Sequence, residues 1–220
     1  MTNPVEFDHP YITVDVLIFC IKDHQLNTLL IKRSHPPFAD MFAIPGGFVA
    51  LGESLDQAAI RVLSQKGHLN QIFLEQLYSF GDVNRDPRGR VISVSYYALV
   101  PQDKVTEFHD KKHTIKWCPV KKLPPLAFDH KQIISTALDR IKAKIAYSSI
   151  AIGLLPKKFR LSQLQTVYEI ILNKLIDKRN FRKKMASVDL LEPVGEIDNT
   201  GSHRPAALYR FKAKTPVIFD

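Results

Sequence analysis

Apolar and β-branched residues are distributed along the first part of the chain in runs that predict a sheet. Residues 11–20 (YITVDVLIFC) and 26–33 (LNTLLIKR) are two such runs, and a polar segment at residues 22–25 separates them. We expect two strands joined by a polar turn. Further strands are expected at residues 73–80, 90–100 and 114–119, and the second of these alternates around Ser93 and Ser95.

Two segments of the same part have apolar positions at helical spacing. In residues 54–68 the apolar side is formed by Leu55, Ala58, Ala59, Val62 and Leu63. We expect Ser54 to be the N-cap of this helix, with Gln57 three residues later. Residues 128–147 are expected to form a long helix that ends the domain. The fold class predicted for residues 1–148 is therefore α/β, a sandwich of a mixed sheet between helices.

The pattern changes after residue 148, which predicts a second domain at residues 149–220. Gly153 and Pro156 interrupt the chain, and an apolar stripe at helical spacing then follows at Leu161, Leu164, Tyr168, Ile171 and Leu175. We expect Ser162 to cap this helix, with Gln165 three residues later. Residues 177–188 predict a basic helix, and residues 193–198 and 208–212 predict a hairpin around a turn at 199–201. This order is typical of a winged helix-turn-helix domain.

The positive charge of the chain lies mainly in the second domain. The net charge is +9, and residues 151–220 hold 13 Lys and Arg against 7 Asp and Glu, a net of +6. A basic domain suggests a polyanionic partner, with nucleic acid first. We find no secretory signal and no apolar run that would span a membrane, and Cys20 and Cys118 are expected to be core thiols. These features predict a cytoplasmic protein.

The basic helix has the division of faces that a DNA-recognition helix needs. Phe181, Met185 and Val188 form an apolar face for packing. The candidate DNA-binding residues are Lys178, Arg179, Asn180, Arg182, Lys183 and Lys184 on the helix, with His203 and Arg204 at the hairpin tip. Taken alone, the hairpin is better explained as a surface hairpin with one exposed arginine.

Residues 47–69 (GFVALGESLDQAAIRVLSQKGHL) resemble a Nudix box, but the acids that would hold a metal are absent. The pattern expects glutamates where Val62, Gln65 and Lys66 stand, and Mg²⁺ prefers oxygen ligands that include one or two carboxylates. We therefore predict no catalytic residue, no bound metal and no cofactor. Glu53 and Arg61 are expected to brace the loop on the helix. Lys66 is either a solvated surface charge or a partner for a ligand phosphate.

Nearly the whole chain resembles the Nudix-related transcriptional regulators of the NrtR type. The resemblance rests on RSHPPFADMFAIPGGF (33–48), the degenerate box, GDVNRDPRGR (81–90), PLAFDH (125–130), RNFRKKM (179–185) and RPAALYRF (204–211). It implies a homodimeric repressor of NAD metabolism that binds operator DNA. It also implies a Nudix domain that senses ADP-ribose or a related NAD metabolite, although relatives that respond to sugars exist.

The resemblance also implies which side chains bind the effector: Arg33, Lys66, Asn84, Arg85, Asp86 and Arg88. Arginines suit a diphosphate because the guanidinium group donates two parallel hydrogen bonds, and Asp86 would accept bonds from ribose hydroxyls. The alternative is that the loop at residues 84–88 is only a solvated turn. Phe128 and His130 are expected to be helix-entry residues rather than a wall of the pocket.

Two other functions fit parts of the sequence. The chain could be a Nudix hydrolase that cleaves ADP-ribose or a nucleoside diphosphate derivative, with the second domain serving for dimerisation. It could also be an RNA-binding or scaffold protein, which the basic helix permits and the hairpin does not favour. The missing acids argue against the hydrolase.

Overall fold

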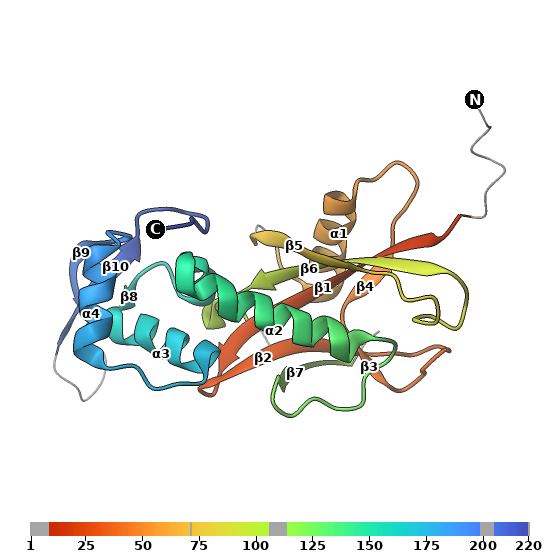
Figure 1. Ribbon diagram of the computed structural model, residues 1–220, viewed down its shortest axis with the longest axis horizontal. Coiled ribbons are helices and arrows are strands. Elements are labelled where there is room, and N and C mark those ends of the chain that lie inside the picture. Colours follow the sequence, from red (N-terminus) through yellow and green to blue (C-terminus); the bar gives the residue numbers. More distant parts are fainter. Residues whose placement is uncertain (1–8, 71, 106–113, 199–204, 220) are drawn as a thin grey trace. The chain divides into compact units, whose positions relative to one another are not determined.

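The computed structural model (Figure 1) describes residues 9–70, 72–105, 114–198 and 205–219. Within these ranges a mixed sheet comes first, and a small domain of helices and strands follows. Among the described residues, no helix is long and apolar enough to cross a membrane.

The sheet is formed by β1 to β7, in the order β3-β2-β1-β6-β5, with β4 pairing to β1 and β7 pairing to β2. Their bounds are β1 Tyr11–Lys22, β2 Gln25–Lys32, β3 Phe42–Ala43, β4 Gly46–Phe48, β5 Leu74–Phe80, β6 Val91–Leu99 and β7 Ile115–Pro119. The strands predicted from apolar runs are confirmed to within two residues at each end. Asp23 and His24 have φ angles of 51° and 56°, which makes the turn between β1 and β2 tight.

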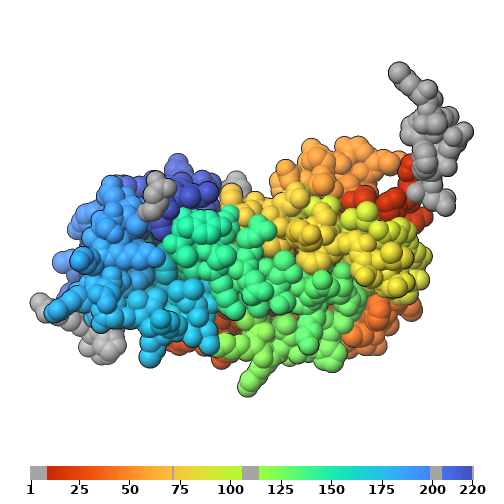
Figure 2. Space-filling view, viewed as in Figure 1, coloured from red at the N-terminus to blue at the C-terminus, as the bar shows by residue number. Residues whose placement is uncertain are grey.

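Strands β1 and β6 are buried along nearly their whole length, which shows that both faces of the sheet are covered. Ser93 and Ser95 on β6 are therefore fully buried, although the alternation of apolar and polar residues in a strand is typical of one solvated face. Two helices supply the cover, α1 (Leu55–Gly67) and α2 (His130–Tyr147). Side chains of α2 cover much of the near face in Figure 2.

Helix α1 begins as the sequence predicts. The Ser54 side chain accepts from the Gln57 backbone N–H at 3.2 Å, and the Gln57 side chain accepts from the Ser54 N–H at 2.7 Å. Helix α2 begins at His130 rather than at residue 128, because Phe128 has a φ of 54°, which a right-handed helix does not allow. A short 3₁₀ turn, η2 (Gln102–Lys104), follows β6.

The second domain contains η3 (Ile150–Leu154), β8 (Phe159–Arg160), α3 (Leu161–Leu172), α4 (Lys178–Ser187), β9 (Leu191–Asp198) and β10 (Ala206–Phe211). The two predicted helices and the hairpin strands are confirmed, and the predicted turn at 199–201 lies outside the described residues. The strand β8 was not predicted. A strand of two residues shows no periodicity, so the sequence could not indicate it. In the structure, β8 pairs antiparallel with β10 and makes the small sheet three-stranded.

Two details of α3 differ from the prediction. Ser162 is not the cap: the N-cap is Arg160, whose backbone N–H donates to the Gln163 side chain at 2.7 Å. Leu175 does not belong to the apolar stripe, because the helix ends at Leu172 and Asn173 takes a left-handed conformation. Leu175 is 86% exposed as a result.

Contacts between residues divide the chain into two compact units. The first holds most of the sheet, α1 and the beginning of α2. The second holds Leu138–Asp220, together with Phe19–Asn27 at the turn between β1 and β2 and the segment that follows β6. The predicted boundary at residues 148 and 149 stays a prediction.

Candidate functional site

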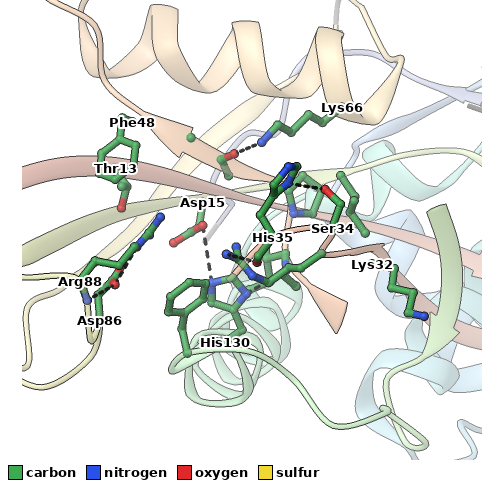
Figure 3. A pocket seen from close by; sticks show the side chains of 18 of the residues that line it. Thr13, Asp15, Lys32, Ser34, His35, Phe48, Lys66, Asp86, Arg88 and His130 are labelled. Carbon is green, nitrogen blue, oxygen red and sulfur yellow. Dashed lines mark hydrogen bonds and ion pairs between the residues drawn. The ribbon is translucent and has the colours of Figure 1, made fainter. Parts of the chain in front are cut away.

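A cavity of about 310 Å³ is lined by residues of β1, β4 and α1 and by residues of the segments 33–35 and 85–88 (Figure 3). Five of the six predicted effector residues line it: Arg33, Lys66, Arg85, Asp86 and Arg88. Asn84 is exposed and is not among the lining residues. Its side chain is the one predicted ligand contact that the fold keeps out of the cavity wall.

Two arginines that line the cavity have their guanidinium groups over aromatic rings. The Arg33 guanidinium lies 4.7 Å from the Phe128 ring centre, and its Nε donates to the Pro37 carbonyl at 2.9 Å. The Arg88 guanidinium lies 5.3 Å from the Phe48 ring and 5.4 Å from the Phe128 ring. Stacking on rings holds planar guanidinium groups in place and leaves their remaining donors free to point at an anion.

Arg85 and Asp86 have structural partners that the sequence did not predict. Arg85 is 8% exposed and forms two hydrogen bonds to Asp129, at 2.8 and 2.7 Å. Asp86 is 5% exposed, and its two carboxylate oxygens accept from the Arg88 guanidinium at 2.9 and 2.6 Å. Both residues line the cavity, but in this arrangement Arg85 braces the wall and Asp86 orients Arg88.

Lys66 is neither a freely solvated charge nor a bare cation facing the cavity. Its Nζ donates a hydrogen bond to the Gly46 carbonyl, across from α1 to β4 (Figure 3). Burial lowers the pKa of Lys66 below its ordinary value. The ammonium group is thus fixed at the cavity wall, where a phosphate oxygen could reach its remaining donors.

Glu53 and Arg61 brace the loop, as predicted. Arg61 donates to both oxygens of Glu53, and Glu53 also accepts from the Ala50 N–H at 2.7 Å. The hydrogen bonds from Arg61 are the main reason why the pKa of Glu53 falls to about 2. Both carboxylate oxygens are therefore engaged by the helix and the loop that precedes it.

The residues present do not fit the divalent metal that a Nudix box implies. Val62 is buried in the core at 1% exposure, Gln65 is exposed, and Lys66 is positively charged. Within the described ranges, no three His, Cys, Asp or Glu side chains gather as metal ligands would. Glu53 is the one acid of the pattern that the helix and its loop retain, and Arg61 already neutralises it.

The fold brings five further polar residues to the cavity that were not predicted from the sequence: Thr13, Asp15, Lys32, Ser34 and His35. A signal for Asp15 was present, because it is the one charged residue in the apolar run of residues 11–20. Phe128 and His130 also line the cavity, so the expectation that they serve only at the helix entry was too narrow. The His130 Nδ1 accepts from the Ile44 N–H at 2.8 Å, and burial lowers the pKa of His130.

A second candidate site is the exposed face of α4. All six predicted DNA-binding residues on this helix are exposed, whereas Phe181 and Met185 are 2% and 4% exposed. The Phe181 ring packs edge-on against Tyr168 of α3 at 5.2 Å, and Asp177 caps the helix by accepting from the Asn180 N–H. The predicted hairpin-tip residues His203 and Arg204 lie outside the described residues.

Charges on the strands of this domain are mostly compensated, in contrast to those on α4. Four ion pairs join strand or flanking residues: Lys158 with Glu196, Arg160 with Asp198, Arg210 with Glu192, and Lys212 with Asp189. In the described part of the chain, no Lys or Arg of α4 forms an ion pair. Among the described residues of the domain, most of the lysines and arginines without an ion pair therefore lie on α4.

Comparisons with known proteins identify both parts of the chain. Residues 11–137 match the family model of the NUDIX domain, and residues 151–211 match that of the NrtR DNA-binding winged helix domain. The chain is 36% identical to the ADPR responsive transcriptional repressor NtrR of Acinetobacter baylyi, over 94% of this chain and 84% of that protein. This chain belongs to the NrtR family.

Solved structures extend the similarity to the NrtR fold. Shewanella oneidensis NrtR complexed with a 27mer DNA aligns with a TM-score of 0.81 and 37% identity, covering 91% of this chain and 93% of that chain. The Nudix domain of the same protein, complexed with ADP ribose, aligns with a TM-score of 0.56 and 36% identity over 64% of this chain and 94% of that chain. The α/β Nudix domain followed by a winged helix is thus confirmed.

One relative of this NrtR family member is an enzyme. The ADP-ribose pyrophosphatase of Methanocaldococcus jannaschii is 37% identical over 126 residues, which are 57% of this chain and 72% of that protein. This similarity is confined to part of the chain.

Proposed function

We propose that this chain is a transcriptional repressor that binds operator DNA through α4 and the hairpin and that responds to ADP-ribose in the Nudix cavity. The observation that carries the proposal is that one chain combines a cavity lined by cations with a helix whose exposed face is basic. The relatives in Acinetobacter and Shewanella support both halves of it. We further propose that the protein acts as a homodimer in the cytoplasm and controls genes of NAD metabolism.

The cavity suits ADP-ribose through its charges and its rings. A diphosphate carries negative charge, which the cationic side chains of Arg33, Lys66 and Arg88 in the cavity wall complement. A base can stack on aromatic side chains, which Phe48 and Phe128 provide. We propose Arg33, Lys66 and Arg88 as direct contacts and Arg85 and Asp86 as residues that hold the wall in shape.

ADP-ribose changes repression only if it binds the DNA-competent and the DNA-free arrangements with different affinity. We propose that effector binding alters the placement of the two winged helices in a dimer and weakens operator binding. By reciprocity, operator DNA then weakens the binding of ADP-ribose by the same factor.

Fluorescence polarisation tests the proposal with labelled DNA from the region upstream of the protein's own operon. We expect sequence-specific binding at physiological salt and release of the DNA as ADP-ribose is added, whereas ADP-ribose should not release an unrelated basic DNA-binding protein. Absence of specific binding would overturn the proposed repressor. Specific binding that no concentration of ADP-ribose alters would overturn the proposed effector.

We propose that the Nudix domain does not hydrolyse its ligand, although the pyrophosphatase relative favours an enzyme as the alternative. Val62, Gln65 and Lys66 offer one neutral oxygen and one positive charge where carboxylates would be needed. An assay of ADP-ribose cleavage with Mg²⁺ or Mn²⁺ decides between the two. We expect the wild type to remain at background, and turnover well above background would establish the hydrolase.

A further inference from the structure

One of the buried charged groups of the cavity is the carboxylate of Asp15 on β1. Its side chain is 8% exposed, against 41% for Arg88. Asp15 pairs in register with Gly46 of β4, and a Cβ at position 46 would collide with Asp15 Oδ1. The glycine therefore makes room for a carboxylate in the cavity wall, between Lys66 and His130 (Figure 3).

The two oxygens of Asp15 have different surroundings. Oδ2 accepts a hydrogen bond of 2.5 Å from the hydroxyl of Ser93, which is fully buried, and lies 3.7 Å from Arg85. Oδ1 lies 3.7 Å from His130 Nε2, which is beyond hydrogen-bond length. Among the described residues, none donates a hydrogen bond to Oδ1. Ser93 thus orients the carboxylate and leaves one oxygen open to a ligand in the cavity.

A carboxylate selects its partner by charge and by hydrogen-bonding type. An ionised carboxylate only accepts hydrogen bonds, so a ligand hydroxyl satisfies it, whereas a phosphate oxygen offers neither a donor nor an opposite charge. A buried acceptor left without a donor costs free energy. Asp15 therefore favours a hydroxyl-bearing group beside it and disfavours a phosphate at the same place.

The cations of the cavity would fix the opposite end of such a ligand. Lys66, Arg33 and Arg88 line the same cavity as Asp15. Phe48, which is 46% exposed, supplies an aromatic surface nearer the solvent. A ligand whose phosphates meet these cations and whose base lies on Phe48 would bring the opposite end to Asp15. In ADP-ribose, that end is the ribose that carries no base.

Resting on the proposed function, we propose that Asp15 is the specificity-determining residue that binds the hydroxyls of the terminal ribose through Oδ1. Ser93 is then a positioning residue, because it acts through Asp15. This pair distinguishes ADP-ribose from nucleotides that end in a phosphate.

Calorimetric titration of the full-length protein with ADP-ribose and with ADP tests the assignment. We expect wild type to bind ADP-ribose more tightly than ADP. Asp15→Asn keeps the shape and the acceptor for Ser93 but weakens the bond to a hydroxyl and removes the repulsion of phosphate. It should weaken ADP-ribose binding by roughly tenfold or more and leave ADP binding unchanged or slightly tighter.

Three comparisons keep this result interpretable. Ser93→Ala should give a smaller loss for ADP-ribose alone and carries the test if Asp15→Asn does not fold. Asp139→Asn, at an exposed position of α2 outside the cavity, should change neither affinity. Equal weakening of both ligands by Asp15→Asn, or no weakening of either, overturns the role of Asp15. A wild type that binds neither ligand overturns the proposed effector itself.

Discussion

Lys66 stands where the Nudix pattern has a glutamate, and the structure shows what the exchange of charge does locally. Its ammonium group bonds to the Gly46 carbonyl and faces the same cavity as Arg33 and Arg88. A positive charge at this place repels a divalent cation and attracts a phosphate. A lysine in place of this glutamate therefore removes a metal ligand that hydrolysis requires and adds a cation that suits the binding of a phosphate.

The first prediction concerns this ammonium group. Lys66→Gln should weaken ADP-ribose binding by about tenfold, because a hydrogen bond to a charged group contributes on the order of 1.5–3 kcal/mol and partial exposure reduces that value. Operator affinity without ligand should remain at the wild-type level. Calorimetry and polarisation measure the two quantities, with the exposed Lys142→Gln on α2 as the control. An unchanged affinity for ADP-ribose would remove Lys66 from the binding site.

The second prediction is a dependence of stability on pH that arises from His130. Burial lowers its pKa below the ordinary value of 6.5, so the unfolded chain takes up a proton before the folded chain does. The stabilising effect is complete above about pH 6.5 and is lost as the pH falls toward the lower pKa of the folded state. We expect His130→Asn to lose less stability than wild type between pH 7 and pH 5.

Denaturant titrations at several pH values measure this difference as a change of slope, independent of any overall destabilisation by the substitution. His24→Asn is the matched control, because His24 is exposed and asparagine tolerates its φ of 56°. Parallel slopes for wild type and His130→Asn would show that His130 is not the group responsible.

At the scale of elements, α4 separates packing from recognition. Phe181 and Met185 anchor one side, and the exposed side carries uncompensated cations, whereas the neighbouring strands pair theirs with acids. Each phosphate that a cation neutralises releases counterions from DNA, which makes affinity depend on salt. The salt dependence of operator binding should therefore arise mainly from α4.

The third prediction follows from that distribution. Lys183→Ala should reduce the steepness of log affinity against log salt concentration by about one, with little effect on folding because the side chain is exposed. Lys212→Ala, which removes a cation paired with Asp189, should change the slope less. Polarisation titrations between 50 and 200 mM salt, roughly, cover the useful range. Identical slopes for Lys183→Ala and wild type would place Lys183 away from the phosphates.

At the scale of the whole chain, the last residues return to the segment that joins α2 to η3. The Phe219 N–H donates to the Tyr147 carbonyl, and the Ser149 N–H donates to the Val217 carbonyl, each at 2.9 Å. The Val217 N–H also donates to the Ser149 hydroxyl at 2.9 Å. These hydrogen bonds join residues 217–219 to residues 147–149, about 70 positions earlier in the sequence. The matched winged helix domain ends at residue 211, so residues 217–219 lie outside it.

The fourth prediction tests these hydrogen bonds. Truncation after residue 214 removes the hydrogen bonds that Val217 and Phe219 form with Ser149 and Tyr147. It should lower the free energy of unfolding of the second unit by about 1–3 kcal/mol. Thermal melting and hydrogen exchange at residues 147–149 measure the effect. Phe219→Ala, which keeps the backbone bonds, should cost less than the truncation. Wild-type protection of residues 147–149 in the truncated chain would show that these hydrogen bonds contribute nothing.

The sequence by itself determined the elements and the two-part organisation. Strands, helices and the basic face of α4 follow from periodicity and charge, which are local properties of the chain. The Ser54 cap, the brace between Glu53 and Arg61 and the loss of metal ligands were also predictable, because residues close in sequence decide them. The Ser162 cap and the place of Leu175 were predicted wrongly, since several residues can cap a helix and a competing C-cap ended this one at Asn173.

Only the tertiary structure decided which side chains share the cavity and what each is free to do. Asp15 and His130 meet across strands and a helix that are more than 100 residues apart, so no local pattern links them. Arg85 and Asp86 lie in a loop that looked free to bind, yet Asp129 and Arg88 occupy their hydrogen-bonding groups. A sequence shows that a group can donate or accept, whereas burial and packing decide whether its partner comes from the protein or from the ligand.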